Sequence, residues 1–204
     1  MFIIGLTGGI ACGKTAVSDI LRQFGAATFD IDEETHKMLQ PGGELFKIYV
    51  QHFGEQVILN DGNLDKKLIS EIIFHDRFER FWINSVAHPV LLNKTRDFLV
   101  ECSERGEEIV VLELPLLFEV GWQNLVDEVW AVYLPSELQI YRLVKRDKIT
   151  AEQAVARINS QMPIDEICRR ADVIIQNKGT QEQLCKKIFV ALKGKLSQKK
   201  LLTE

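Results

Sequence analysis

The sequence predicts an α/β protein in which a parallel β-sheet of five strands is flanked by helices. Two observations lead to this prediction. Short apolar segments typical of buried strands alternate with segments whose apolar residues recur at helical spacing. At the N-terminus the order is strand, glycine-rich loop, helix, strand, and a βαβ unit of this kind places its strands in parallel with both faces covered.

The first βαβ unit is predicted over residues 2–29. Residues 2–6 are mostly apolar and end in turn residues, which indicates a short buried strand. Residues 14–24 carry apolar side chains at helical spacing, and Gly25 is a favourable helix stop. Residues 26–29 then form the second predicted strand.

The pattern changes between residues 33 and 105. Helical segments dominate there, and we expect breaks at residues 41–43 (Pro-Gly-Gly), 61–63 (Asp-Gly-Asn) and 88–89 (His-Pro). Nothing in this stretch has the pattern of a strong strand. We therefore expect a helical subdomain inserted into the α/β core.

The second half of the chain returns to alternating strands and helices. Thr150 and Gln153 have the spacing of a capping box, which predicts a helix start. The last residues are rich in lysine, and we expect them to be frayed. The predicted strands are 109–114, 129–134 and 173–176, the predicted helices are 138–146, 151–161 and 180–192, and the tail is 194–204.

Composition places the chain among ordinary globular proteins. With 46% hydrophobic and 26% charged residues and a net charge of −4, it lacks the basic bias of a duplex nucleic-acid binder. The apolar N-terminal run has no basic stretch before it and is interrupted by glycines, so we expect neither a signal peptide nor a membrane partner. Four scattered cysteines favour free thiols in a reducing compartment, which predicts a cytoplasmic location.

A glycine-rich loop carries the clearest functional pattern. Residues 8–15 match G-x-x-x-x-G-K-[ST] between a predicted strand and a predicted helix, as phosphate binding requires. Glycines let the main-chain N–H groups turn toward one point, which the positive end of the helix dipole also faces. We expect Lys14 to reach the β- and γ-phosphates of ATP and the Thr15 hydroxyl to ligate Mg²⁺. The residues expected to bind nucleotide here are Gly8, Gly9, Ala11, Cys12, Gly13, Lys14, Thr15 and Ala16.

This loop predicts the P-loop NTPase fold but leaves the reaction open between a small-molecule kinase, a GTP-dependent switch and a motor ATPase. Residues 177–180 begin like the guanine-binding motif N-K-x-D, but Thr180 stands where a carboxylate is needed. A motor usually has a larger core. The helical insertion and the basic segment after the fourth strand favour a kinase, because both can enclose ATP and an acceptor away from water.

Further motifs are spread along the chain. They are Asp-Ile-Asp at 30–32, His-Pro at 88–89, Pro-Leu-Leu-Phe-Glu at 115–119, Q-x-x-R-x-x-x-R at 139–146, R-x-x-x-Q at 157–161, Ala-Asp at 171–172 and Asn-x-Gly at 177–179. Together with the loop, they resemble the dephospho-CoA kinase family over about residues 2–192. The resemblance implies Mg²⁺-assisted transfer from ATP to the ribose 3′-hydroxyl of 3′-dephospho-CoA, the last step of coenzyme A biosynthesis. The alternatives are another small-molecule kinase, such as a nucleoside monophosphate kinase, and a non-catalytic nucleotide-binding switch.

The resemblance also implies roles for single residues. Asp32 follows the second strand, at the edge where open α/β sheets bind ligands, and is expected to accept or orient the acceptor's proton, although it is also placed to cap the next helix. Residues 139–169 are implied to form a lid in which Arg146 and Arg157 stabilise the transferring phosphoryl group. Residues 33–105 would hold the acceptor, around a core of about 1–32, 106–138 and 170–194. The implied catalytic residues are Asp32, Lys14, Arg146 and Arg157, the further nucleotide-binding residues are Arg142, Asn177 and Gly179, and the acceptor-binding residues are Asp32, His36, Lys66, His88 and Leu116.

The chain departs from the family pattern at several of these positions. Cys12 stands in the loop where Ser is usual, and Glu113 ends the third strand where many members have Asp. His36 and Lys66 both stand where Arg is frequent. A contact of His36 with a substrate phosphate would depend on pH, because histidine is only partly charged near neutrality.

Overall fold

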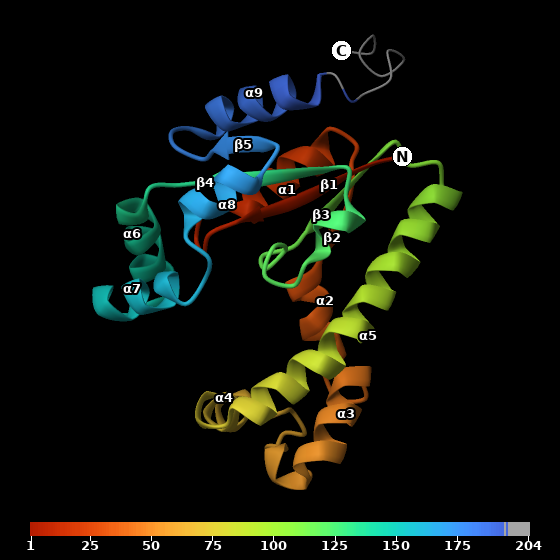
Figure 1. Cartoon of the computed structure of the whole chain (residues 1–204), viewed down its shortest axis with the longest axis vertical. Coiled ribbons are helices and arrows are strands. Elements are labelled where there is room, and N and C mark those ends of the chain that lie inside the picture. Colours follow the sequence, from red (N-terminus) through yellow and green to blue (C-terminus); the bar gives the residue numbers. More distant parts are fainter. Residues whose placement is uncertain (194, 196–204) are drawn as a thin grey trace. The chain divides into compact units, whose positions relative to one another are not determined.

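The computed structural model describes residues 1–193 and residue 195 (Figure 1). It divides the chain into two compact units. One unit, here called the α/β unit, contains residues 1–29 and the chain from residue 101 onward. The other, called the helical unit, is Asp30–Val100. The tail that was predicted to be frayed, 194–204, lies outside the described residues except for Lys195.

The α/β unit is built on a five-stranded parallel sheet, which confirms the predicted fold class. The strand order is β2-β3-β1-β4-β5, so β1 is central, with Ile4 opposite Val111 of β3 on one side and Glu128 of β4 on the other. The first four strands along the chain have both limits within two residues of the predicted ones. The fifth strand has the predicted limits. The strands are β1 (Phe2–Gly8), β2 (Ala27–Asp30), β3 (Ile109–Glu113), β4 (Glu128–Tyr133) and β5 (Val173–Gln176).

Helices of the α/β unit bury apolar side chains against this sheet. Leu21 of the first helix and Ile188 of the last are fully buried in one cluster with Ile4, Leu6 and Trp130 of the sheet. Capping boxes start α7 and α9, and the first of them confirms the predicted pairing of Thr150 with Gln153. The helices are α1 (Lys14–Gln23), α6 (Ser136–Asp147), α7 (Ala151–Asn159), α8 (Ile164–Arg170), which was not predicted, and α9 (Gln181–Leu192), with a short 3₁₀ turn η2 (Trp122–Leu125).

The helical unit packs around a cluster of aromatic rings. His52 stacks on Trp82 with ring centroids 3.5 Å apart, and Phe53 meets Trp82 edge-on. Tyr49 joins this cluster, with its ring centroid 6.0 Å from that of Trp82. The predicted breaks at residues 41–43 and 61–63 also fall between helices. The elements are α2 (Ile31–Met38), α3 (Glu44–Phe53), η1 (Glu55–Val57), α4 (Lys66–His75) and α5 (Arg77–Glu104).

The predicted helix break at residues 88–89 is wrong. α5 runs through Pro89 without interruption. A proline inside a helix removes one donor and costs about 3 kcal/mol. Here a buried stripe, Ala87, Leu91 and Thr95, crosses the proline at four-residue spacing. Burial of a leucine alone contributes about 1.5–3 kcal/mol, so the packing on both sides of Pro89 offsets the local cost.

Long helices raise the question of membrane insertion. α5 is the longest helix, with 28 residues, but polar and charged residues occur along its whole length. Within the part of the chain that is described, no helix combines the length and the apolar character needed to cross a bilayer.

Candidate active site

The glycine-rich loop joins the end of β1 to the start of α1. Gly8 ends β1 with φ 143°, and a Cβ there would lie 2.5 Å from the Val132 carbonyl oxygen. Gly13 precedes α1 with φ 89°, and a Cβ there would lie 2.2 Å from Nδ2 of Asn177. A side chain at either position would be strained and would collide with neighbouring atoms. The loop therefore needs both glycines to lie this close to β4 and to the segment after β5.

Two residues from the C-terminal part of the chain hold the loop backbone. The Asn177 side chain is buried and donates from Nδ2 to the Cys12 carbonyl at 2.7 Å. Arg142 of α6 donates from Nη1 to the Ala11 carbonyl at 3.4 Å and from Nη2 to the Asn177 carbonyl at 3.3 Å. Both residues were expected to bind nucleotide. Their contacts shape the loop, and direct contact with nucleotide stays a prediction for them and for Gly179, which follows with φ 111°.

Lys14 and Thr15 occupy the first turn of α1. The Lys14 ammonium donates to the carbonyl oxygens of Gly8 and Gly9 at 3.1 and 3.4 Å, which places it across the loop. The Thr15 hydroxyl donates to Oε1 of Glu113 at 3.4 Å. Ala16 follows on an exposed part of the same turn.

The Thr15 hydroxyl and the Glu113 carboxylate form a donor set that suits Mg²⁺. Both are hard oxygen ligands, and Glu113 lies 5% exposed at the end of β3, beside β1. Among the residues described, no three His, Cys, Asp or Glu side chains form a metal cluster. This arrangement fits Mg²⁺, which proteins usually hold through one or two side chains together with substrate phosphates. The sequence had marked Glu113 as a departure from the family pattern and left its role in metal binding open.

Cys12 belongs to the loop and is fully buried. Burial raises the pKa of its thiol to about 11. Since the thiolate is the nucleophile, a thiol with this pKa is unreactive at neutral pH.

We expect Cys12 to resist alkylation in the folded protein. With a pKa of about 11, about one thiol in a thousand is ionised at pH 8. Pulses of iodoacetamide between pH 7 and 11, followed by peptide mass spectrometry, would measure the labelling of each cysteine. The half-buried Cys185 is the internal control and is expected to react first. Equal labelling rates for Cys12 and Cys185 at pH 8 would contradict the prediction.

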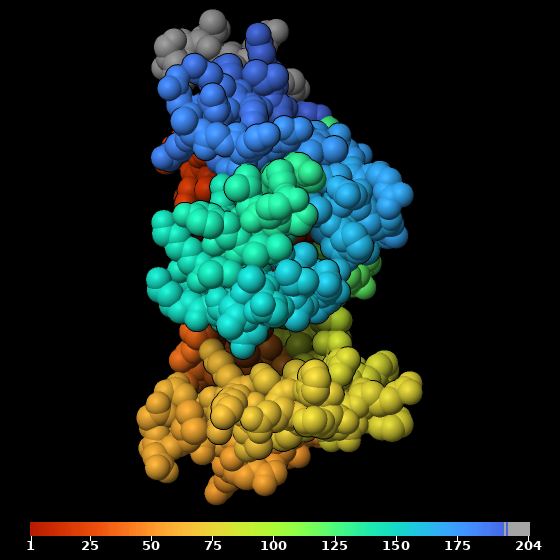
Figure 2. All heavy atoms as spheres, turned by 90° about the vertical axis from the view of Figure 1, so that its left-hand side faces the viewer, coloured from red at the N-terminus to blue at the C-terminus, as the bar shows by residue number. Residues whose placement is uncertain are grey.

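The predicted lid contains α6 and α7, which lie side by side at one surface of the α/β unit (Figures 1 and 2). Arg146 of α6 and Arg157 of α7 both bond the carboxylate of Asp147, at 2.7 and 2.6 Å. After α7, Oε1 of Gln161 accepts a hydrogen bond from the N–H of Ile10 in the loop at 3.0 Å. Sequence reasoning missed Asp147, whose only sign in the sequence is its place directly after Arg146.

In the helical unit, Asp30 caps α2. Its Oδ1 accepts from the N–H groups of Asp32 and Glu33 at 2.9 and 3.2 Å. The expectation that Asp32 caps this helix is therefore wrong, because the cap lies two residues earlier. Asp32 sits in the first turn of α2, directly after β2.

The structure brings together two of the other predicted acceptor-binding residues. Nδ1 of His36 lies 3.0 Å from Nζ of Lys66, and Nε2 of His36 lies 3.1 Å from Nε2 of Gln40. His88 lies within α5 just before Pro89, away from any helix end. Leu116 belongs to the α/β unit, where it follows β3 and is 45% exposed.

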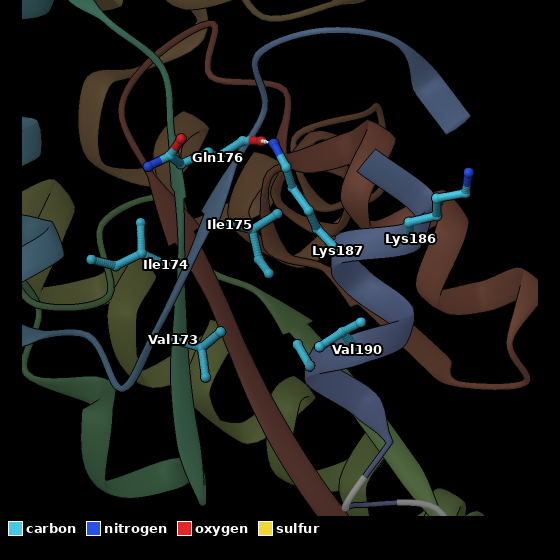
Figure 3. A pocket seen from close by; sticks show the side chains of 8 residues that line it. Val173, Ile174, Ile175, Gln176, Lys186, Lys187 and Val190 are labelled. Carbon is cyan, nitrogen blue, oxygen red and sulfur yellow. Dashed lines mark hydrogen bonds between the residues drawn. The ribbon is translucent and has the colours of Figure 1, made fainter. Parts of the chain in front are cut away.

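A separate hollow lies between β5 and α9 (Figure 3). Its volume is about 470 Å³, and its lining is mainly apolar, from β5 and from Val190 and Ala191 of α9. On its rim the Lys187 ammonium donates to the Gln176 carbonyl at 2.8 Å. None of the predicted site residues lines this hollow, so it is distinct from the nucleotide loop.

The central strand β1, the glycine-rich loop and the Lys14–Thr15 pair at the start of α1 define a P-loop NTPase-fold protein. The sequence profile of dephospho-CoA kinase matches residues 2–183. A curated dephospho-CoA kinase of Carboxydothermus hydrogenoformans is 40% identical over 190 residues, covering 93% of this chain and 92% of that protein. The chain belongs to the dephospho-CoA kinase family, which confirms the resemblance predicted from its motifs.

Solved structures agree with this assignment. A crystal structure of a Thermus thermophilus protein is similar with a TM-score of 0.81 and 28% identity, covering 96% of this chain and 98% of that one. Dephospho-CoA kinase from Campylobacter jejuni is similar with a TM-score of 0.68 and 27% identity, covering 94% and 95% of the two chains. Both likenesses extend over almost the whole chain.

Proposed function

We propose that this protein transfers the γ-phosphoryl group of ATP to the ribose 3′-hydroxyl of 3′-dephospho-CoA, giving coenzyme A and ADP. Membership in the dephospho-CoA kinase family over residues 2–183 is the observation that carries this proposal. The loop geometry supports ATP as the donor, because both glycines, Lys14 and Thr15 are arranged for a triphosphate. The free state of all four cysteines supports a cytoplasmic location.

In the α/β unit, the chain's own groups neutralise the charge of the donor. Loop N–H groups and the Lys14 ammonium bind the phosphates, and Arg146 and Arg157 stabilise the charge that develops on the transferring phosphoryl oxygens. Thr15 and Glu113 are the residues that would hold Mg²⁺. When bound, this ion supplies further charge neutralisation at the β- and γ-phosphate oxygens.

The helical unit supplies four of the five groups proposed for the acceptor, and the fifth, Leu116, lies in the α/β unit. We assign Asp32 as the base that accepts or orients the proton of the ribose hydroxyl. His36 and Lys66 lie side by side, with Nζ of Lys66 3.0 Å from Nδ1 of His36, and the Lys66 ammonium offers donors for an anionic group of the acceptor. His88 and Leu116 complete the set of acceptor-binding residues that the family pattern implies.

An ADP-release assay with different acceptors tests this function. We expect rapid turnover with 3′-dephospho-CoA, loss of turnover when Mg²⁺ is chelated, and a new 3′-phosphate in the ³¹P NMR spectrum of the product. Turnover with adenosine 5′-monophosphate instead would identify a nucleoside monophosphate kinase. Tight ATP binding without turnover of any acceptor would favour a nucleotide-dependent switch.

A further inference from the structure

One carboxylate joins the two candidate arginines of the lid. Asp147 is the last residue of α6 and follows Arg146 directly, while Arg157 lies ten residues further along, in α7. Lys148 has φ 55°, and this left-handed residue ends α6 and turns the chain toward α7. Oδ1 of Asp147 accepts from Nε of Arg146 at 2.7 Å, and Oδ2 accepts from Nη2 of Arg146 at 3.2 Å and from Nη1 of Arg157 at 2.6 Å. We call this arrangement the Asp147 bridge.

The bridge leaves most donors of both arginines available. Each guanidinium group has five N–H donors, and Asp147 uses Nε and Nη2 of Arg146 and Nη1 of Arg157. The side chains of Arg146 and Arg157 are 60% and 51% exposed, whereas that of Asp147 is 20% exposed. The carboxylate therefore lies on the protein side and the two guanidinium groups lie toward solvent, where phosphate oxygens can reach them.

Charge explains why the two arginines need a shared partner. Two guanidinium groups side by side repel each other. The guanidinium of Arg146, and then that of Arg157, holds the pKa of Asp147 below its usual range, so the carboxylate stays ionised at neutral pH. The three groups together carry a net charge of +1. Without the carboxylate, the repulsion between the two cations would be uncompensated.

We propose that Asp147 is a positioning residue that holds Arg146 and Arg157 together so that both act on the same transferring phosphoryl group. This inference rests on the proposed function. The arginines make the contacts to the phosphoryl oxygens, and Asp147 acts only through them. Two guanidinium groups that are already held in place lose less conformational entropy on reaching the transition state than two that move independently.

A role in stability alone would need the bridge to contribute strongly to folding. Ion pairs with exposed arginines contribute little, because solvent screens them. The protein also contains a matched arrangement near the C-terminal end of the implied lid, among residues with no predicted catalytic or binding role. In α8, Glu166 pairs with Arg169 and Arg170, both at 2.6 Å. This second carboxylate between two arginines serves as the control.

The test compares Asp147→Asn with Glu166→Gln in the full chain. For Asp147→Asn we expect kcat to fall at least about 10-fold, because the amide offers one acceptor oxygen and turns N–H donors toward a guanidinium group. The KM for ATP should stay the same or fall, since one negative charge near the triphosphate is removed. The Tm should change by less than about 4 °C. Asp147→Glu should recover part of kcat, and Glu166→Gln should match the wild type throughout.

A double-mutant cycle checks that Asp147 acts through its partner. In an Arg157→Ala background, Asp147→Asn should lower kcat much less than it does alone. Fully additive losses would overturn the positioning role. The positioning role would also be overturned if kcat were unchanged or raised in Asp147→Asn while the wild type and Glu166→Gln turned over normally. In that case the proposed function would stand. Failure of the wild type to use 3′-dephospho-CoA would overturn the proposed function and, with it, the role of Asp147.

Discussion

Replacing Lys14 with alanine is expected to lower kcat by about 10²- to 10³-fold, the usual loss when one preorganised donor to a developing charge is removed. In the structure the Lys14 ammonium already lies across the loop, on the carbonyl oxygens of Gly8 and Gly9. It therefore needs little rearrangement to meet the β- and γ-phosphates. Steady-state kinetics with ATP as the varied substrate would measure the effect.

Lys187→Ala is the matched control for this change. Its ammonium also donates to a carbonyl oxygen at the end of a strand, that of Gln176 at 2.8 Å, but it borders the hollow between β5 and α9 (Figure 3). We expect Lys187→Ala to keep wild-type kcat. A Lys14→Ala protein that turned over within a few-fold of the wild type would remove Lys14 from the predicted catalytic set.

Asp32→Asn is expected to lower kcat by about 10²- to 10⁴-fold, the usual contribution of a positioned general base. An amide has nearly the same shape as the carboxylate but cannot accept the proton of the ribose hydroxyl. Binding of ATP should change little, because the loop N–H groups and Lys14, and not Asp32, are expected to bind its phosphates. Single-turnover kinetics together with titration calorimetry of ATP would separate the two effects.

Glu33→Gln controls for the loss of negative charge at the start of α2. Glu33 is the next residue in the same helical turn, and its side chain is 64% exposed. Both substitutions remove one charge near the helix N-terminus, so both weaken the interaction with the helix dipole to a similar extent. Only Asp32→Asn should affect turnover. Equal kcat values for the two variants would contradict the assignment of Asp32 as the base.

Local sequence patterns predicted the sheet and the loop well. The five strands and the capping box of α7 depend on the periodicity and the type of neighbouring residues, which the sequence displays directly. The position of the phosphate loop is local in the same way, because its motif lies between a strand and a helix that are neighbours in the sequence. The family resemblance could be recognised from the sequence because each motif is a short run of neighbouring residues.

Contacts between distant residues could not be predicted in this way. The helix α5 continues through Pro89 because a buried stripe of side chains packs on both sides of the proline. This packing involves residues outside the helix, so the residues around Pro89 do not reveal it. The Asp147 bridge to Arg157 depends on how the chain turns at Lys148. Glu113 illustrates a third limit, since its contact with Thr15 arises only when β3 pairs with β1.

The hydrogen bond from Asn177 to the Cys12 carbonyl joins residues 165 positions apart. A ribosome adds about 5–20 residues each second, so about 8–30 s separate the appearance of the two partners. During that interval the glycine-rich loop of the nascent chain lacks its hydrogen bond to Asn177. This contact to the backbone of the nucleotide loop can therefore form only after synthesis has passed residue 177.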